Sequence, residues 1–347
     1  FKVVINDSPI SGLELLNFLD YELPSIKITG QEIHHTDLMQ NYIEEVCSQA
    51  KFLKKMKVVV DCGNGSAGEI APRLMKALGH EVIELFCEID GNFPNHHPDP
   101  GKPENLEDLV DAVQKFNADL GIAFDGDGDR LGVVSNLGEI IFPDQLLMIF
   151  AQDILSRIKG AEIVFDVKCS NLLGEIIEAS GGKPCMSATG HFHIKNALKK
   201  SGAPLAGEMS GHIFFNDQWY GFDDGHYSAF RLIEIISQMN ESLASIFGSL
   251  PRAFSTPEIN IEVEENQKFR IVEDFIKNAE FSEGTKITID GLRVNFQDGW
   301  GLLRASNTTP KLVLRFEAKT SDRLVEIQNL FLKQLKQIDE SIKIELS

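Results

Sequence analysis

The chain has 347 residues, of which 43% are hydrophobic and 24% are charged, and its formal net charge is −19. This length predicts about two or three domains. The excess of 52 acidic over 33 basic residues argues against nucleic acid or an anionic membrane as the main partner, because both require a positive surface. An anionic ligand would therefore need a locally basic site.

The cysteines and the apolar segments indicate the cellular compartment in which the protein is expected. The chain has five cysteines and no CxxC pair, which favours reduced thiols over a disulfide framework or a zinc site. No apolar run approaches the roughly 20 residues that cross a bilayer. We therefore expect a cytoplasmic protein. The chain opens on FKVVINDSP without a methionine, so we expect it to be cut at its N-terminus, and the missing signal peptide carries little weight.

Between residues 57 and 142 the hydrophobic pattern alternates between two periods. Runs rich in β-branched residues predict buried strands, and apolar residues three or four apart predict helices. The predicted strands are 57–61, 80–86 and 118–124, the predicted helices are 67–79 and 105–117, and a hairpin follows at 130–142. Strands that alternate with helices indicate βαβ crossovers and a mostly parallel sheet.

A second cycle of this kind follows, and then the order of elements changes. The second cycle has helices at 144–158, 171–180 and 228–239, a strand at 161–167 and a loop-rich stretch at 184–227. Two prolines indicate a linker at 249–258. The last part has predicted strands at 259–264, 285–290, 292–297 and 311–318 and helices at 268–279 and 322–337. Its Asp290-Gly291 pair predicts a hairpin turn and hence an antiparallel sheet.

These elements define the expected fold class, which is α/β. We expect tandem α/β domains with mixed, mostly parallel sheets flanked by helices, plus a small α+β C-terminal domain with an antiparallel sheet. The expected units are a remnant of a first α/β domain at 1–40, α/β domains at 41–142 and 143–251, and the C-terminal domain at 252–347.

The most distinctive motif is the acidic loop GIAFDGDGDRLG, residues 121–132. Asp125, Asp127 and Asp129 follow a predicted buried strand, and their oxygens are expected to converge on one point. A hard divalent cation prefers such ligands. A calcium loop starting at Asp125 would need glycine where Arg130 stands and glutamate where Asn136 stands, so that pattern fails. The loop therefore predicts Mg²⁺, with Arg130 facing an anion beside it.

A second glycine-rich motif must be tested as a possible nucleotide-binding site. GNGSAG, residues 63–68, satisfies the dinucleotide fingerprint G-x-G-x-x-G, and Glu84 follows about twenty residues on. Asp61 and Cys62 stand between the strand and the first glycine, where a carboxylate would crowd a pyrophosphate. A plain turn from strand to helix is therefore favoured over a nucleotide site.

Three further polar stretches offer groups that could bind a polar or anionic ligand. In GEMSGH, residues 207–212, Glu208, Ser210 and His212 suit neighbouring sugar hydroxyls, although a structural turn remains an alternative. TGHFHIK, residues 189–195, places His191 where a loop meets a helix, and Lys168 ends a predicted strand, where ligands of parallel sheets bind. RASNTTP, residues 304–310, offers a guanidinium, hydroxyls and an amide, which suit a phosphate dianion, although a β-turn would look similar.

Taken in order, the motifs GNFPNHHPDP, DGDGDR, TGH, GEMSGH and RASNTTP resemble those of the α-D-phosphohexomutases, and within that family the bacterial phosphomannomutase/phosphoglucomutase branch. The resemblance runs from residue 1 to about 340 and implies four domains around a deep cleft. It implies an isomerase that moves a phosphoryl group between the C1 and C6 oxygens of a hexose phosphate through a bisphosphorylated intermediate. It further implies a monomer that requires Mg²⁺, binds mannose and glucose phosphates and is activated by glucose 1,6-bisphosphate.

The resemblance also implies a role for each motif residue. Asp125, Asp127 and Asp129 would hold Mg²⁺ together with a phosphoserine oxygen, and Lys2, Arg130 and His212 would be catalytic. Glu208 and Ser210 would bind the sugar O3 and O4, and Met209 favours glucose and mannose phosphates over glucosamine phosphate. Arg304, Ser306, Asn307 and Thr308 would hold the non-reacting phosphate. The full substrate-binding set is Lys168, Thr189, Gly190, His191, Glu208, Met209, Ser210, Gly211, His212, Arg304, Ala305, Ser306, Asn307 and Thr308.

One departure from the family pattern limits this expectation. The phosphoserine loop of the family has the form T-[AG]-S-H-N-P and is followed by N-G-F-K, and no such serine loop occurs in the sequence. Phe1 and Lys2 match the end of N-G-F-K, so the chain begins just after the nucleophile. Alone it is expected to be inactive. A non-catalytic sugar phosphate binding protein is the alternative, and an aspartyl-phosphate hydrolase lacks the Thr/Ser and Lys constellation that it would need.

Overall fold

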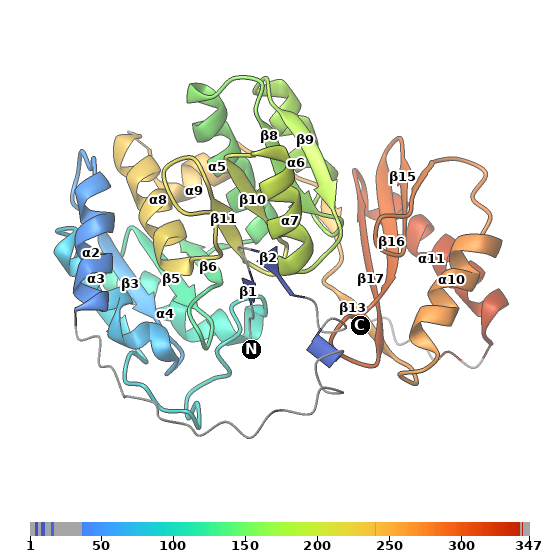
Figure 1. Cartoon of the computed structure of the whole chain (residues 1–347), viewed down its shortest axis with the longest axis horizontal. Helices are drawn as coiled ribbons and strands as arrows, with labels where there is room; N and C mark the ends of the chain where they lie inside the picture. The colour runs from blue at the N-terminus through green and yellow to red at the C-terminus, as the bar shows by residue number, and fades with distance from the viewer. Residues whose placement is uncertain are drawn as a thin grey trace.

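The computed structural model describes residues 4–5, 8–10, 15–16, 37–239, 241–340 and 342. Three sheets lie side by side, in chain order from the blue end of the chain to the red end (Figure 1). A short antiparallel pair, β1 (Val4–Ile5) and β2 (Ser8–Pro9), precedes them. The expected domain remnant at 1–40 falls mostly outside the described residues. In the part of the chain that the structure describes, no helix has the length and apolarity needed to traverse a bilayer.

The first sheet has five strands in the order β4-β3-β5-β6-β7. Its strands are β3 (Lys57–Asp61), β4 (Glu81–Leu85), β5 (Leu120–Phe124), β6 (Leu131–Ser135) and β7 (Ile140–Ile141). The first three run parallel, and β5, β6 and β7 pair antiparallel, which confirms the predicted hairpin. Side chains alternate across β3: Val58 and Val60 pack with α2 (Leu38–Gln49) and α3 (Ala71–Ala77), while Val59 packs with α4 (Glu107–Phe116).

The second sheet has four strands in the order β11-β10-β8-β9. They are β8 (Glu162–Asp166), β9 (Lys183–Ser187), β10 (Leu205–Gly207) and β11 (Ile213–Phe215), and only the β10–β11 pair is antiparallel. One face is covered by α5 (Pro143–Arg157), α6 (Asn171–Ala179) and α8 (Gly225–Gln238), and the other by α7 (His191–Ser201). One continuous core joins this unit to the first. Because cores are tightly packed, the loops at the ends of the two sheets keep a fixed position relative to each other.

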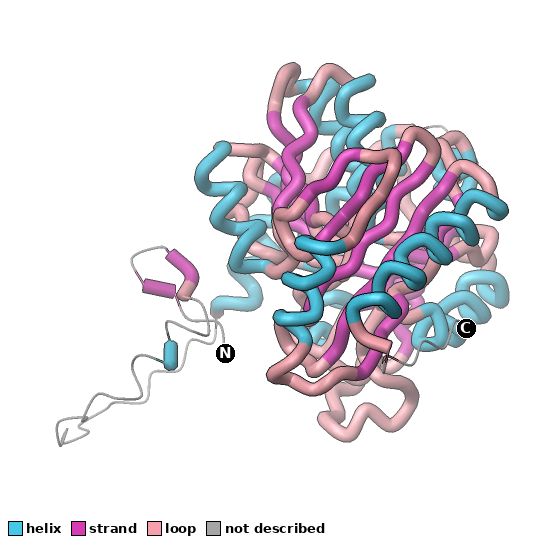
Figure 2. Tube along the Cα trace, turned by 90° about the vertical axis from the view of Figure 1, so that its right-hand side faces the viewer, coloured by secondary structure: helices cyan, strands magenta, loops and turns pink. Residues whose placement is uncertain are grey.

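The third sheet is antiparallel throughout, in the order β12-β17-β16-β15-β14, with β13 also paired to β17. Its strands are β12 (Phe254–Ser255), β13 (Ile259–Glu262), β14 (Thr285–Ile287), β15 (Leu292–Phe296), β16 (Gly299–Ala305) and β17 (Lys311–Ala318). On one face lie α10 (Lys268–Asn278) and α11 (Ser321–Ile338) (Figure 2). The Asp290-Gly291 turn joins β14 to β15, with Gly291 at a φ of 74°. The predicted fold class is confirmed.

One sequence-based prediction about local structure is wrong, and a second is incomplete. The stretch 184–227 is mostly regular structure, because β9, α7, β10 and β11 lie within it. These strands are only three to five residues long, too short for a periodic signal. The predicted linker at 249–258 follows the short helix α9 (Leu243–Gly248) and is mostly irregular, but it also contains β12, which pairs with β17. Single turns of 3-10 helix, η1 (Ser66–Glu69) and η2 (Pro103–Leu106), begin two of the helical stretches.

Candidate active site

The acidic loop lies between β5 and β6 of the first sheet. Asp125 is buried, with 1% of its surface exposed, whereas Asp127 is exposed and Asp129 is half-buried. Each carboxylate offers an oxygen within 4.8 Å of the other two. Three carboxylates at this spacing form a set of hard oxygen donors, and Asp127 leaves its side open to solvent, so the residues present fit a divalent cation such as Mg²⁺.

Arg130 neutralises part of this charge. Its Nε lies 2.5 Å from Asp125 Oδ2, and its Nη1 lies 3.0 Å from Asp99 Oδ1. The backbone N–H groups of Gly128 and Arg130 both donate to Asp125 Oδ1 at 3.0 Å. Burial raises the pKa of Asp125, and the guanidinium of Arg130 opposes that rise. A cation at Asp125 would therefore compete with Arg130 for Oδ2.

The GNGSAG turn packs against the backbone of the acidic loop. Ser66 N donates to Gly126 O at 3.0 Å, and a Cβ added at Gly65 would lie 2.9 Å from the same oxygen. Asp61, at the end of β3, accepts from Gly63 N and from His96 Nε2, at 2.9 and 3.1 Å. The structure thus has the favoured turn from strand to helix, with its backbone packed against the acidic loop.

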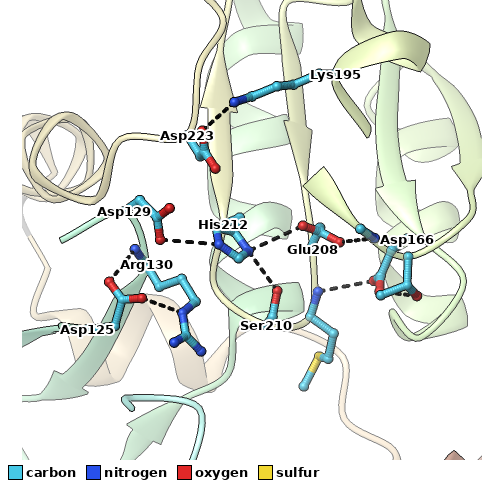
Figure 3. Close-up of polar contacts among 12 residues, drawn as sticks. Asp125, Asp129, Arg130, Asp166, Lys195, Glu208, Ser210, His212 and Asp223 are labelled. Atoms are coloured by element: carbon cyan, nitrogen blue, oxygen red, sulfur yellow. Dashed lines mark hydrogen bonds and ion pairs between the residues drawn. The ribbon is translucent and has the colours of Figure 1, made fainter. Parts of the chain in front are cut away.

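The GEMSGH loop connects β10 to β11 and faces the acidic loop (Figure 3). His212 lies at the centre of the contact. Its Nε2 is 3.2 Å from Asp129 Oδ1, and its Nδ1 is 3.3 Å from Glu208 Oε2 and 3.0 Å from Ser210 Oγ. Leu131 N donates to Gly211 O at 3.2 Å, so the two loops are also joined through their backbones.

The charges of this cluster stabilise one another. Burial opposes protonation of His212, but the hydrogen bonds to Asp129 and Glu208 raise its pKa to about 9. Burial likewise opposes ionisation of Glu208, yet the bond and charge of His212 lower the pKa of that carboxyl. At neutral pH the cluster holds an imidazolium between two carboxylates, so His212 is poised to donate a proton rather than to accept one.

Asp166 joins the substrate loops and is a residue that the sequence analysis missed. It ends β8 with no exposed surface. One carboxylate oxygen accepts from Met209 N at 3.1 Å and from Cys169 Sγ at 3.1 Å, and the other accepts from Thr189 Oγ1 at 3.0 Å. Its position at the carboxyl end of a parallel strand, two residues before Lys168, was the available signal.

The TGH stretch leads into α7. Gly190 has a φ of 122°, in the region that favours glycine, and donates its N–H to Glu208 Oε1 at 2.6 Å. His191 is the first residue of α7. Lys168 is 6% exposed, and its Nζ lies 2.5 Å from Glu258 Oε1. Burial opposes the charge on Lys168, but Asp166 and Glu258 raise its pKa.

The RASNTTP loop connects β16 to β17. Arg304 is 4% exposed, and its Nε lies 2.9 Å from Asp290 Oδ2, while its Nη2 is buried without a partner among the described residues. The same Asp290 oxygen accepts from Thr189 N at 3.0 Å, and Asn307 Nδ2 donates to Thr189 O at 3.3 Å. The loop therefore docks on the TGH stretch. Ala305 and Ser306 are buried, and Asn307 and Thr308 are exposed.

A cavity of about 690 Å³ lies where the three units meet. Its lining includes predicted site residues from loops of the first and second units, namely Arg130, Lys168, Met209 and Ser210. Glu258, Asn260 and Arg315 contribute from the third unit. Arg304, His191 and Thr189 lie outside its lining, so the predicted phosphate loop does not line this cavity. Lys2 lies outside the described residues.

Comparison with known proteins places this arrangement in a family. Residues 39–138, 142–254 and 258–334 match the models for phosphoglucomutase/phosphomannomutase alpha/beta/alpha domain II, alpha/beta/alpha domain III and C-terminal domain. A phosphomannomutase/phosphoglucomutase of Pseudomonas putida is 51% identical over 345 residues, 99% of this chain and 74% of the relative. Its counterpart in Pseudomonas aeruginosa is 56% identical over 312 residues, 90% of this chain and 67% of the relative.

A solved structure agrees with these sequence matches. The crystal structure of a phosphoglucomutase/phosphomannomutase family protein from Burkholderia thailandensis superposes with a TM-score of 0.84 at 47% identity, covering 89% of this chain and 66% of that one. The chain belongs to the phosphoglucomutase/phosphomannomutase family, a family of isomerases, and spans about two thirds to three quarters of the length of these relatives.

Proposed function

We propose that this chain is the phosphosugar-binding part of a mutase that moves a phosphoryl group between the C1 and C6 oxygens of glucose and mannose phosphates through a bisphosphorylated intermediate. The observation that supports it most is the contact of His212 with both Asp129 and Glu208, which brings the predicted metal loop and the predicted sugar loop to one point. The three sheets support domains at 41–142, 143–251 and 252–347 that bind metal, sugar and phosphate respectively.

Each loop supplies a distinct part of the chemistry. Asp125, Asp127 and Asp129 would hold Mg²⁺, which when bound offsets the negative charge of a transferring phosphoryl group. Glu208 and Ser210 would bind the sugar O3 and O4, hydroxyls that keep their places when the sugar turns over. His212 would hold a proton near the reacting oxygen.

The phosphate loop would hold the end of the sugar that does not react. Arg304 has a buried Nη2 with hydrogen-bonding capacity to spare among the described residues, and Ser306, Asn307 and Thr308 add a hydroxyl, an amide and backbone N–H groups. A guanidinium with neighbouring donors suits a phosphate dianion. Lys168, just beyond the carboxyl end of β8, adds a second positive charge close enough to Arg304 to interact with it.

We further propose that this 347-residue chain binds phosphosugars as a cytoplasmic monomer without turning them over. The loops for metal, sugar and phosphate are present, but covalent phosphoryl transfer needs a nucleophile that carries the group between substrates. The sequence has no T-[AG]-S-H-N-P loop to supply it. Glucose 1,6-bisphosphate, the proposed activator, would then bind without phosphorylating the chain. A purely binding role would have the same outcome, so the two functions must be separated by extending the chain.

Calorimetry and intact mass test both statements. Glucose 1-phosphate, mannose 1-phosphate and glucose 1,6-bisphosphate should each bind the chain in the presence of Mg²⁺, and the mass should not increase after incubation with the bisphosphate. Arg304→Met should abolish binding, while Arg270→Met, an exposed arginine of α10, should not. A polypeptide extended upstream with the serine loop should gain one phosphoryl group and mutase activity. An extended protein that binds but stays inactive would support the non-catalytic alternative, and phosphorylation of the unextended chain would disprove the missing nucleophile.

A further inference from the structure

Two buried arginines of the third sheet hold the turn that carries Lys168. Arg293 of β15 donates from Nη1 to Val167 O and to Cys169 O, the latter at 2.8 Å. Arg315 of β17 donates from Nη1 to Lys168 O at 2.6 Å. Three consecutive carbonyls of one turn are thus bound by two side chains from another unit.

The arginines are themselves held in place. The Arg293 guanidinium stacks on the ring of Trp300, with its Cζ 3.7 Å from the ring centroid, and Trp300 Nε1 donates to Glu317 Oε1 at 2.8 Å. Arg315 Nη2 lies 3.6 Å from Asp144 Oδ2. Trp300 also packs with Val167 and Leu302 in a small cluster of its own between the second and third units. The guanidinium groups are therefore fixed in position before any ligand binds.

Burial of the charged Arg293 side chain costs desolvation free energy, and its surroundings offset only part of that cost. Its side chain has no exposed surface, and burial lowers its pKa to about 10. Among the described residues it forms no ion pair, and its N–H groups donate to the turn carbonyls, to Asn171 Oδ1 at 2.6 Å and to Asn295 Oδ1 at 3.0 Å. A buried guanidinium without a carboxylate is costly compared with an apolar residue of similar size. In return, these hydrogen bonds fix the geometry of the turn at residues 167–169.

The turn determines where Lys168 lies. Lys168 lines the central cavity, and its Nζ contacts Glu258, which precedes β13. Its carbonyl is bound by Arg315, so both ends of this residue are held from the third unit, which also carries the phosphate loop at 304–310. A shift of the third sheet would therefore move Lys168 together with Arg304.

We infer that Arg293 and Arg315 are positioning residues that act through Lys168, setting its place in the phosphosugar site and coupling it to the phosphate loop. This inference rests on the proposed function for its effect on ligand affinity. The holding of the turn is a separate consequence that can be measured without ligand, so failure of the one can be distinguished from failure of the other.

The first experiment measures the turn by amide hydrogen exchange in the ligand-free chain. Arg315→Met and Arg293→Met should each accelerate exchange at Cys169 and Ser170, while Arg323→Met, an arginine of α11 bonded to Asp298, should leave it unchanged. Thermal melting establishes that each variant is folded. If Arg293→Met fails to fold, Arg315→Met carries the test. Exchange at the wild-type rate in a folded Arg315→Met chain would overturn the inference.

The second experiment is a double-mutant cycle on the binding of glucose 1,6-bisphosphate, measured by calorimetry. Arg315→Met should weaken binding about tenfold, the effect of losing a hydrogen bond that positions a charge. In a Lys168→Met background the same change should weaken binding less than about twofold, because the arginine acts through the lysine. Arg315→Lys, which retains a donor for the carbonyl, should restore part of the affinity.

The outcomes of the cycle are distinct. Equal losses in both backgrounds would mean that Arg315 contacts the ligand directly or acts only on the fold, and the inference would be wrong. If the wild-type chain binds no phosphosugar, the proposed function fails for this chain, while the exchange measurement still decides whether the arginines hold the turn.

Discussion

His212 Nε2 lies 3.2 Å from Asp129 Oδ1, and this contact joins the second sheet to the first. Asp129 belongs to the acidic loop, which follows the buried strand β5, and His212 ends the GEMSGH loop that leads into β11. The imidazolium therefore lies between the proposed metal ligands and the proposed sugar ligands. A change in charge on one loop should therefore alter the electrostatic energy and the pKa values of the groups on the other.

We predict that Asp127→Asn weakens Mg²⁺ binding by about tenfold or more, because it removes a charged oxygen from the exposed member of the carboxylate set. Titration calorimetry with MgCl₂ on the metal-free chain measures this. Asp111→Asn, an exposed aspartate of α4, is the matched control and should bind Mg²⁺ like the wild type. Equal affinity in all three proteins would show that the acidic loop is not the metal site.

Glu208→Gln should weaken the binding of glucose and mannose phosphates to the same extent. The two sugars share an equatorial O3, and loss of a charged acceptor costs about 1.5–3 kcal/mol. Calorimetry with both 1-phosphates provides the comparison, and Glu178→Gln, an exposed glutamate of α6, provides the control. A loss confined to one sugar would mean that Glu208 does not bind O3.

The free energy of unfolding of the metal-free chain should depend on His212 between about pH 6.5 and 9. The folded-state pKa of about 9 lies above the unfolded value of about 6.5, so the stabilisation is complete below pH 6.5 and is lost as the pH rises through 9. The difference corresponds to roughly 3 kcal/mol. Urea unfolding across this range should give a steeper decline for the wild type than for His212→Gln. Parallel curves would show that the imidazolium does not stabilise the fold.

Gly65→Ala should lower both the melting temperature and the affinity for Mg²⁺. The backbone of Gly65 is in an ordinary extended conformation, with φ −79°, so the obstacle is space and not strain. Its Cβ would lie 2.9 Å from Gly126 O in the acidic loop, and overpacking of this kind costs about 1–3 kcal/mol. Gly248→Ala, at the end of α9, meets no atom within 4 Å and serves as the control. A Gly65→Ala chain with unchanged melting and Mg²⁺ affinity would mean that the turn does not support the loop.

The sequence was most informative where chemistry is concentrated in a short motif. The acidic loop, GEMSGH and RASNTTP could each be recognised locally, because their residue types are unusual for a surface turn. The helices α5, α10 and α11 were predicted to within a few residues from their periodicity. Short elements such as β10, with three residues, carry too little pattern to be recognised alone.

Contacts between residues far apart in the sequence were beyond the reach of sequence reasoning. The partnership of Arg304 with Asp290 depends on where β15 and β16 place the two residues, and that of Arg315 with Lys168 O depends on how two sheets dock. The predicted roles of the site residues stay predictions, although the structure brings Asp129, Glu208 and His212 together.

The carboxylate of Asp166 has a consequence for altering sugar preference. Because it accepts from the Cys169 thiol, the Thr189 hydroxyl and the Met209 amide, it makes three separate loops depend on one buried charge. Transplanting a GEMSGH segment from another mutase would place the backbone N–H of residue 209 in a new loop while leaving the other two donors in their original places. A graft that exchanges residues 166–170, 188–191 and 207–212 as a set keeps these bonds matched, so the proposed sugar specificity should transfer only when all three segments are exchanged together.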